Sequence, residues 1–507
     1  MKKRAFAIRP GFLGVLLMAS GLLSSAAADT ALTIYSSADS AGVPAELYRP
    51  VDGAEAMRGS AVPGFAIVRE ERELELPAGR SQQRFVDVAA YIDPTTVTFA
   101  SLTEPATRVL EQSFQFDLVN SRKLLLRYLG RPVTVERVQG SQVSTLSGTL
   151  LSASDGLVLR AADGTVTALR DHAAIRFPEL PGGLITQPTL EWLLNSPRAG
   201  KQRTRVSYET GGITWWADYN LVFKPGKDAN SGLLDLSAWV SIVNLSGASY
   251  RETRLKLVAG DVQRTAQLRP MLRRAEAVML TGSAEEPGFA EKAFAEFHLY
   301  TLGRRTDLPD NSTRQLELFD QVRQIPARKL LVYRGLAASF GGGPMLERDY
   351  GLAGNTKVDV HLEFRNDKSL GLGVPLPAGR IRVSQLDDAD GSLEFIGEDR
   401  IGHTARDELV RVRLGTAFDV VGERRQIDFA VDTRARWLEE EIEVRVRNRK
   451  SEPVDVTVAE PMFRSGQWKI LRHSQDYTKV DAQGIQFATR LAAGGESVIR
   501  YRVRYSW

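Results

Sequence analysis

Short runs of β-branched and aromatic residues, each closed by glycine, proline or aspartate, repeat along most of this chain. The run Phe65–Leu76 ends at the turn residues Pro77 to Gly79, and Asp-Gly pairs at 155–156 and 163–164 have the composition of hairpin turns. Runs of this length and spacing are typical of antiparallel sheets. We therefore predict a mainly β protein built from several antiparallel β-sandwiches.

The spacing of these runs divides the chain into four parts. Residues 29–115 are expected to form an N-terminal β domain. In residues 116–180 a leucine-rich helix precedes five short strands, which predicts a small SH3-like or Sm-like barrel that binds RNA or peptide or serves as a structural module. Residues 200–430 are expected to form a large β-sandwich region. Residues 431–507 alternate in the manner of an immunoglobulin-like sandwich.

The segment before these four parts, residues 1–28, has the composition of a cleavable signal peptide. Basic residues from Lys2 to Arg4 precede an apolar stretch, Phe12–Leu23, and small residues lead to Ala28. The apolar stretch is shorter than the roughly 20 residues that a membrane span requires. We expect cleavage between Ala28 and Asp29 and a periplasmic or extracellular mature protein, with an N-terminal membrane anchor as the alternative.

Removal of this segment makes the chain electrically neutral. The sequence holds 66 Lys and Arg against 62 Asp and Glu, and four of the basic residues but no acidic one precede Asp29, which leaves 62 of each. A neutral exported chain lacks the basic surface that nucleic acids require. The absence of cysteine excludes disulfides, thiol chemistry and a lipid-modified cysteine. Downstream of Leu23 no apolar run is long enough for a transmembrane span.

A series of motifs in a fixed order resembles a known family. The motifs are GGITWWADYNLVF (211–223), LSAWVSIVNLSGASYRETRLKLVAGDV (236–262), EFHLYTL (296–302), LPDNSTRQLELF (308–319), PLPAGRIRV (375–383), FIGEDRIGHT (395–404) and GTAFDVVGER (415–424), with FAIVREERELELPAG and IDPTTVTF upstream. Together they resemble the bacterial exported proteins that carry domain of unknown function 4139, some of which are described as mucoidy-inhibitor-like. The resemblance covers nearly all of the mature chain and implies no established activity. Trp216 departs from the family, whose members tend to have a charged residue there.

The sequence contains none of the common catalytic motifs. There is no G-x-S-x-G elbow, no H-E-x-x-H and no cysteine, and the five histidines lack metal-ligand spacing. We therefore expect no enzymatic activity and no cofactor. The alternative is an enzyme that acts on envelope polysaccharides through paired carboxylates, whose separation in space a sequence does not reveal.

One acidic stretch is a candidate metal site. Asp387, Asp388, Asp390 and Glu394 surround Gly391, and Ca²⁺ prefers six to eight oxygen ligands. The full calcium-loop pattern, with a terminal glutamate at the required spacing, is absent. A hairpin turn rich in Asp and Gly is therefore the favoured interpretation, with metal binding as the alternative.

The strand predicted at Ile213–Phe223 carries the best indication of binding. Its odd positions are apolar and its even positions include Trp216, Asp218 and Asn220, so the strand has one core face and one polar face. A flat ring beside hydrogen-bonding groups is suited to stacking on a sugar or a peptide. The favoured interpretation is nevertheless that Trp216 packs beneath a neighbouring domain, because large aromatic side chains are usually buried, with ligand binding as the alternative.

The C-terminal strand allows a further interpretation. Apolar residues alternate with arginines from Ile499 onward, and the chain ends at Trp507. Outer-membrane proteins often end in this way, so an outer-membrane-associated component is an alternative. The principal prediction is an exported, non-enzymatic, β-rich binding or scaffold protein of the cell envelope, with an envelope glycan or another protein as its partner.

Overall fold

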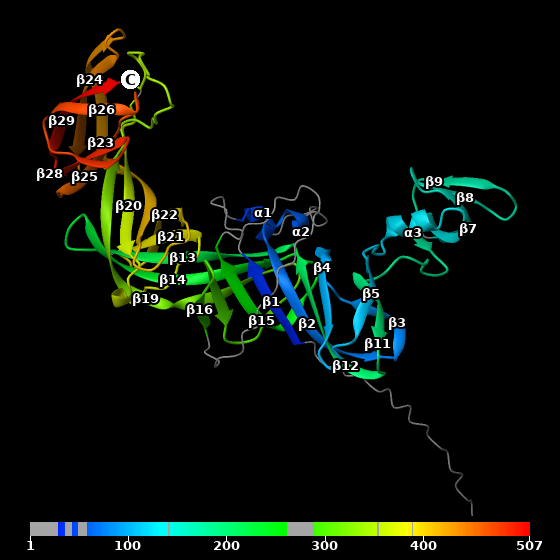
Figure 1. Cartoon of the computed structure of the whole chain (residues 1–507). Helices are drawn as coiled ribbons and strands as arrows, with labels where there is room; N and C mark the ends of the chain where they lie inside the picture. The colour runs from blue at the N-terminus through cyan, green and yellow to red at the C-terminus, as the bar shows by residue number, and fades with distance from the viewer. Residues whose placement is uncertain are drawn as a thin grey trace, which may run out of the picture.

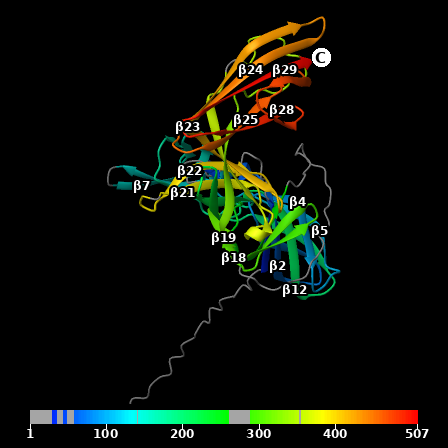
Figure 2. The same ribbon diagram turned by 90° about the vertical axis from the view of Figure 1, so that its left-hand side faces the viewer.

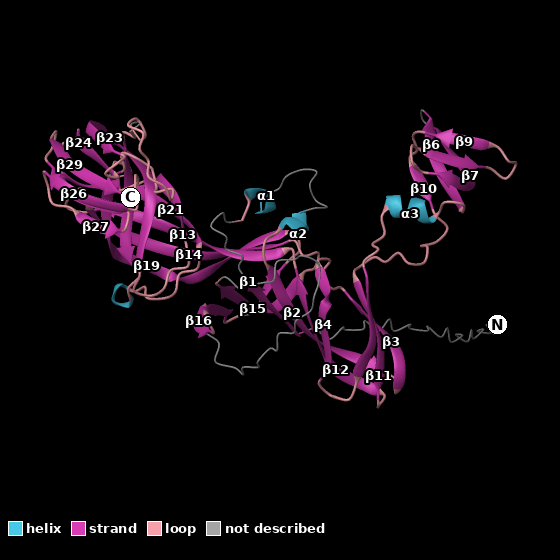
Figure 3. Ribbon diagram, turned by 45° about the horizontal axis from the view of Figure 1, so that its top comes forward, coloured by secondary structure: helices cyan, strands magenta, loops and turns pink. Residues whose placement is uncertain are grey.

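The computed structural model describes residues 29–35, 43–48, 58–139, 142–260, 288–351, 354–387 and 389–507. The fold is mainly β, with 63% strand and 4% helix, as the sequence predicts, and strands dominate every part that is drawn (Figure 3). The helices are α1 (Ala45–Tyr48), α2 (Arg58–Ala61), α3 (Ser121–Arg127) and a 3₁₀ turn (Lys368–Leu370). The predicted signal peptide and Asp388 of the acidic turn lie outside the described residues.

An eight-stranded sheet joins the beginning of the chain to strands beyond residue 200. Its order is β16-β17-β15-β1-β2-β12-β4, and β18 pairs with β15. The strands are β1 (Asp29–Tyr35), β2 (Phe65–Leu76), β4 (Ile92–Ser101), β12 (Gly200–Thr210), β15 (Tyr250–Ala259), β16 (Phe289–Phe294), β17 (Phe297–Leu302) and β18 (Thr306–Leu308). Strand β1 lies inside the sheet, parallel to β15 and antiparallel to β2. The regions 29–115 and 200–430 therefore share one sheet.

Two smaller sheets occupy the chain between β2 and β12. One has the order β3-β11-β5 and the other β10-β6-β7-β8-β9. Their strands are β3 (Gly79–Val86), β5 (Arg108–Gln115), β6 (Pro132–Gln139), β7 (Gln142–Ser152), β8 (Leu157–Arg160), β9 (Val166–Leu169), β10 (Ala174–Arg176) and β11 (Thr189–Ser196). The predicted helix followed by five strands is confirmed by α3, whose N-terminus is capped by the Asn120 side chain, and by β6 to β10. The edge strands β9 and β10 do not pair with each other, so this sheet is open, and its unit stands apart in Figure 1.

The remaining strands form a thirteen-stranded network. Its main path is β22-β21-β13-β14-β19-β20-β23-β24-β29-β26, while β25 pairs with β19 and β28, and β27 with β28. The strands are β13 (Ile213–Pro225), β14 (Ser231–Asn244), β19 (Ser312–Tyr333), β20 (Lys357–Arg365), β21 (Gly379–Leu386), β22 (Leu393–Ile401), β23 (Leu409–Asp432), β24 (Trp437–Asn448), β25 (Val454–Pro461), β26 (Gln467–His473), β27 (Thr478–Asp481), β28 (Gly484–Leu491) and β29 (Glu496–Ser506).

Two long strands of this network belong to two hydrophobic cores at once. Strand β19 contains 22 residues and β23 contains 24, so each extends over roughly 70–80 Å at about 3.3 Å per residue. Leu316 of β19 and Val412 of β23 lie in the central core, whereas Tyr333 and Val420 of the same strands lie in the C-terminal core. Figure 2 shows these strands running up into the C-terminal sandwich. The sandwich is therefore joined to the central body by continuous strands.

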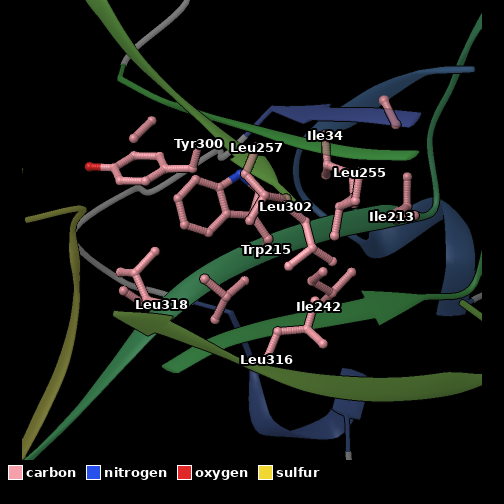
Figure 4. Close-up of a cluster of buried hydrophobic side chains, with 14 of the residues drawn as sticks. Ile34, Ile213, Trp215, Ile242, Leu255, Leu257, Tyr300, Leu302, Leu316 and Leu318 are labelled. Carbon is pink, nitrogen blue, oxygen red and sulfur yellow. The ribbon is translucent and has the colours of Figure 1, made fainter. Parts of the chain in front are cut away.

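The central core is built on the apolar face of β13. The alternate residues from Ile213 to Phe223 are each at most 2% exposed, which confirms the predicted alternation. Trp215, which follows Ile213 on this face, lies among leucine and isoleucine side chains of neighbouring strands (Figure 4). Its indole meets the ring of Tyr300 edge-on, with centroids 6.3 Å apart. Such an aromatic pair stabilises the core by about 0.5–1.5 kcal/mol beyond the burial of its surface.

The C-terminal core contains a buried ion pair that also holds a loop. Arg464 Nε donates to Glu440 at 2.8 Å, and both side chains are 1% exposed. The Arg464 guanidinium also donates to the backbone carbonyls of Met345 (3.1 Å), Glu347 (2.8 Å) and Tyr350 (3.0 Å). These bonds satisfy a charge that would otherwise be costly to bury. The connection between β19 and β20 is thereby fixed to the sandwich.

A second buried ion pair lies in the same sandwich. Arg424 Nε donates to Glu460 at 2.9 Å, with side chains 4% and 0% exposed. The hydroxyl of Tyr501 donates to the same carboxylate, and burial raises the pKa of Tyr501 well above its usual value, so this phenol remains a donor.

The opposite side of β29 carries the arginines that the sequence places between its apolar residues. Arg500, Arg502 and Arg504 lie directly across from the glutamates 443, 441 and 439 of β24. Each of the three arginines is ion-paired to the glutamate opposite. Arg502 is in addition ion-paired to Glu439. The alternating apolar residues of β29, from Ile499 to Tyr505, are at most 1% exposed and belong to the C-terminal core.

The Arg464→Ala variant is expected to lower the free energy of unfolding by about 3–5 kcal/mol, because it leaves the buried Glu440 without its counter-charge. Chemical denaturation of the purified protein measures this change. The matched control is Arg504→Ala in the same sandwich, whose side chain is 48% exposed and whose loss should cost about 1 kcal/mol or less. If the two substitutions lower the free energy of unfolding equally, the buried Arg464–Glu440 pair is no more important for stability than the exposed Arg504.

Candidate functional site: a sheet face with two tryptophans

The polar face of β13 continues across its neighbours in the thirteen-stranded network. Directly paired residues of adjacent strands point to the same side of a sheet, and β13 pairs with β14 and β21, while β14 pairs with β19. We call the resulting surface the tryptophan face. It consists of Trp216, Asp218 and Asn220 of β13, Trp239 and Ser241 of β14, Gln315 and Glu317 of β19, and Arg380 and Arg382 of β21.

Trp239 is the exposed aromatic residue of this face. It lies directly across from Asp218 on one side and from Glu317 on the other, and it is 37% exposed. Sequence reasoning missed it, although the alternation in Leu233–Asn244 contains the signal: residues 234, 236, 238, 240 and 242 are buried in the central core. Trp239 therefore had to point to the opposite side.

Asp218 holds an arginine in place at the centre of the face. Its carboxylate accepts from Arg380 Nη2 at 3.0 Å and Nε at 3.2 Å, and from the Ser241 hydroxyl at 2.6 Å. Burial on its own would lower the pKa of Arg380, but the hydrogen bonds and charge of Asp218 outweigh it and raise that pKa. Asp218 is only 4% exposed. Its role is therefore to position Arg380, and its oxygens are not open to solvent.

Trp216 lies at the end of the face that is covered. Its ring is tilted against that of Tyr48, with centroids 5.3 Å apart. A small apolar cluster surrounds the pair, formed by Leu47, Val62, Val243 and Leu245 with Val43 at its edge. Trp216 is thus packed beneath another segment of the chain, in line with the favoured interpretation that it is covered, although the cover is a short segment and not a domain.

Asn220 lies at the open end of the face. It is exposed and lies across from Arg382 of β21. Arg382 is 40% exposed and its Nε lies 3.1 Å from the Glu398 carboxylate, which is itself 44% exposed. The structure therefore brings Asn220 together with Trp239 and Arg382, and separates it from the covered Trp216.

The acidic residues near Gly391 form the turn of the hairpin between β21 and β22. Asp387 Oδ1 accepts the backbone N–H of Ala389 at 2.9 Å, and Asp390 Oδ1 accepts that of Ser392 at 2.8 Å. The bonds from Ser392 lower the pKa of Asp390. Glu394 accepts from the Ser392 hydroxyl at 2.8 Å. These carboxylates therefore accept hydrogen bonds from groups within the turn, as expected for the hairpin turn that was the favoured interpretation.

No metal-binding group emerges from the part of the chain that the structure describes, since it contains no cluster of three or more His, Asp or Glu side chains arranged to hold an ion. No described helix has the length and apolar character needed to cross a membrane. Comparison with family models, with curated proteins and with solved structures finds no match for this chain. Membership of the family that its motifs resemble therefore stays a prediction.

The Asp218→Asn variant is expected to lower the free energy of unfolding by about 1–3 kcal/mol, since it removes the counter-charge of Arg380, whose side chain is 20% exposed. Thermal and chemical denaturation measure the loss. Asn220→Ala is the matched control on the same strand and should change stability by about 0.5 kcal/mol or less, because Asn220 is exposed. If Asp218→Asn leaves the free energy of unfolding unchanged, the Asp218–Arg380 pair does not stabilise the tryptophan face.

Proposed function

We propose that this chain is an exported, non-enzymatic protein of the cell envelope that binds a glycan on the tryptophan face and presents it from a rigid β scaffold. The observation that carries the proposal is the exposed ring of Trp239, set among hydrogen-bonding side chains on an extended sheet. An indole offers a flat apolar surface, and the neighbouring amide, hydroxyl and guanidinium groups offer donors and acceptors. A pyranose ring presents the complementary combination of an apolar face and a rim of hydroxyls.

The charges on this face favour an uncharged glycan. Arg380 is neutralised by Asp218, and Arg382 lies 3.1 Å from Glu398. Glu317 adds a further carboxylate beside Trp239. Two arginines therefore face three carboxylates, so the surface has no excess of positive charge to attract a polyanion. Neutral oligosaccharides are the class that this surface fits best.

The long strands support the scaffold part of the proposal. Because β19, β20 and β23 contribute to both the central and the C-terminal core, the two bodies cannot rotate freely as domains on a flexible linker do. A rigid, extended protein is suited to holding a bound polymer at a defined distance from other envelope components. Within this proposal we retain the family resemblance, the SH3-like or Sm-like assignment of β6 to β10 and the immunoglobulin-like assignment of residues 431–507.

The proposal concerns location as well as binding. The basic start of the chain, its apolar stretch and the small residues before Asp29 support export. The neutral mature composition and the absence of cysteine are compatible with a free protein of the periplasm or cell surface. The Asp218 carboxylate of the tryptophan face is buried and ion-paired to Arg380, which supports binding without catalysis.

Trp239→Ala is expected to weaken binding at least about tenfold, which corresponds to about 1.4 kcal/mol for a lost aromatic contact. The probes are the neutral hexasaccharides of N-acetylglucosamine and of glucose, titrated calorimetrically into the purified mature protein. The matched control is Trp437→Ala, which removes an indole on the C-terminal sandwich that packs against Arg504 and should leave affinity unchanged.

Two results would contradict the proposal. If Trp239→Ala binds both hexasaccharides as tightly as the unaltered protein, the face is not the binding site. If the protein shortens either hexasaccharide, as seen by new reducing ends, the polysaccharide-acting enzyme becomes the better interpretation.

A further inference from the structure

A short segment of the chain, Val43–Tyr48, covers one end of the tryptophan face; we call it the strap. It contains helix α1 and reaches the face through Leu47 and Tyr48. Leu47 is 8% exposed and fills the apolar cluster beside Val243 and Leu245. The face is thus divided into an open part around Trp239 and a covered part around Trp216.

Tyr48 lies against Trp216 and occupies the space that a bound sugar would need there. Its ring lies against the indole at a tilt of 40°, with the centroids 5.3 Å apart. The Tyr48 side chain also interacts with Arg380 and helps to raise the pKa of that guanidinium, which Asp218 holds in position. A flat ring on the tryptophan with an oxygen at the arginine is the pattern expected for a pyranose stacked on the same residues.

The two tryptophans lie close enough to serve one ligand. Trp216 lies across from Ser241, and Trp239 is two residues earlier on the same strand. Their Cα atoms are therefore diagonal neighbours at roughly 7–8 Å. An oligosaccharide of several rings that contacts Trp239 would meet Trp216 next, if the strap were absent.

We infer that the covered part of the face is a second sugar subsite, and that the strap occupies it as an internal competitor of the glycan. This inference rests on the proposed function. The strap is suited to displacement, because α1 has only four residues and helices of this length are marginal on their own. Binding of a longer oligosaccharide would release Tyr48 and expose Trp216 and Arg380.

The inference predicts a change opposite in sign to that of Trp239→Ala. A hexasaccharide that binds only when the strap is displaced has an apparent dissociation constant equal to the intrinsic one divided by the fraction of protein with a displaced strap. Tyr48→Ala weakens the strap and should therefore tighten binding of the N-acetylglucosamine hexasaccharide by about three- to tenfold. The disaccharide, which the open part around Trp239 accommodates, should bind unchanged.

Three further variants separate this effect from general disturbance of the fold. Tyr48→Phe keeps the ring on Trp216 and should retain an affinity close to that of the unaltered protein. In a Trp216→Ala background the gain from Tyr48→Ala should disappear, because the subsite itself is lost. Tyr350→Ala is the matched control, because Tyr350 packs against Phe463 and not against a residue of the tryptophan face. This substitution should leave the affinity for the hexasaccharide unchanged.

Hydroxyl-radical footprinting with mass spectrometry gives a readout that needs no ligand. Oxidation of Trp216 should rise in Tyr48→Ala while that of the buried Trp215 stays low. If a folded Tyr48→Ala protein binds the hexasaccharide as before or more weakly, while Trp239→Ala still weakens binding at least about tenfold, the strap is not a competitor and the proposed function stands. Absence of binding in all variants overturns both the proposed function and the sugar subsite.

Discussion

The sharing of three strands between two hydrophobic cores is the constraint on which the architecture depends. Each of β19, β20 and β23 buries one half in the central core and the other half in the C-terminal core, so the two bodies are fixed by backbone pairing. The tryptophan face lies at the central end of this arrangement, on β13, β14, β19 and β21. A surface on so many paired strands is preorganised, and a ligand that binds it loses little affinity to ordering of the protein.

Charge is buried in this molecule where two segments must be held together. Arg464 binds Glu440 and four carbonyls of a distant connection, and Asp218 binds Arg380 across 162 positions of sequence. In both cases a charged group acts through several directional bonds, which apolar packing does not provide. The chain contains no cysteine, and these pairs connect distant segments as disulfides do in many other proteins.

Local patterns in the sequence predicted what is local in the structure. Alternation identified the core face of β13, and the leucine-rich stretch before Gly130 identified α3, because period and composition act within one element. They did not predict that Asp218 would be neutralised by Arg380, or that Tyr48 would cover Trp216, because both depend on pairing between distant strands and segments. Trp239 could have been predicted, since its own strand alternates, but an isolated tryptophan with a serine two positions away on either side gave no reason to prefer it.

The position of β1 has a consequence for how the chain acquires its fold. This strand starts at Asp29 and is enclosed between β2 and β15, with Ala31 paired to Arg254. Its second neighbour is therefore synthesised roughly 220 residues later, and contacts of such long range form slowly. Until β15 has been synthesised, β1 can pair only with β2. The order of the strands thus delays completion of the eight-stranded sheet until the chain beyond residue 250 is available.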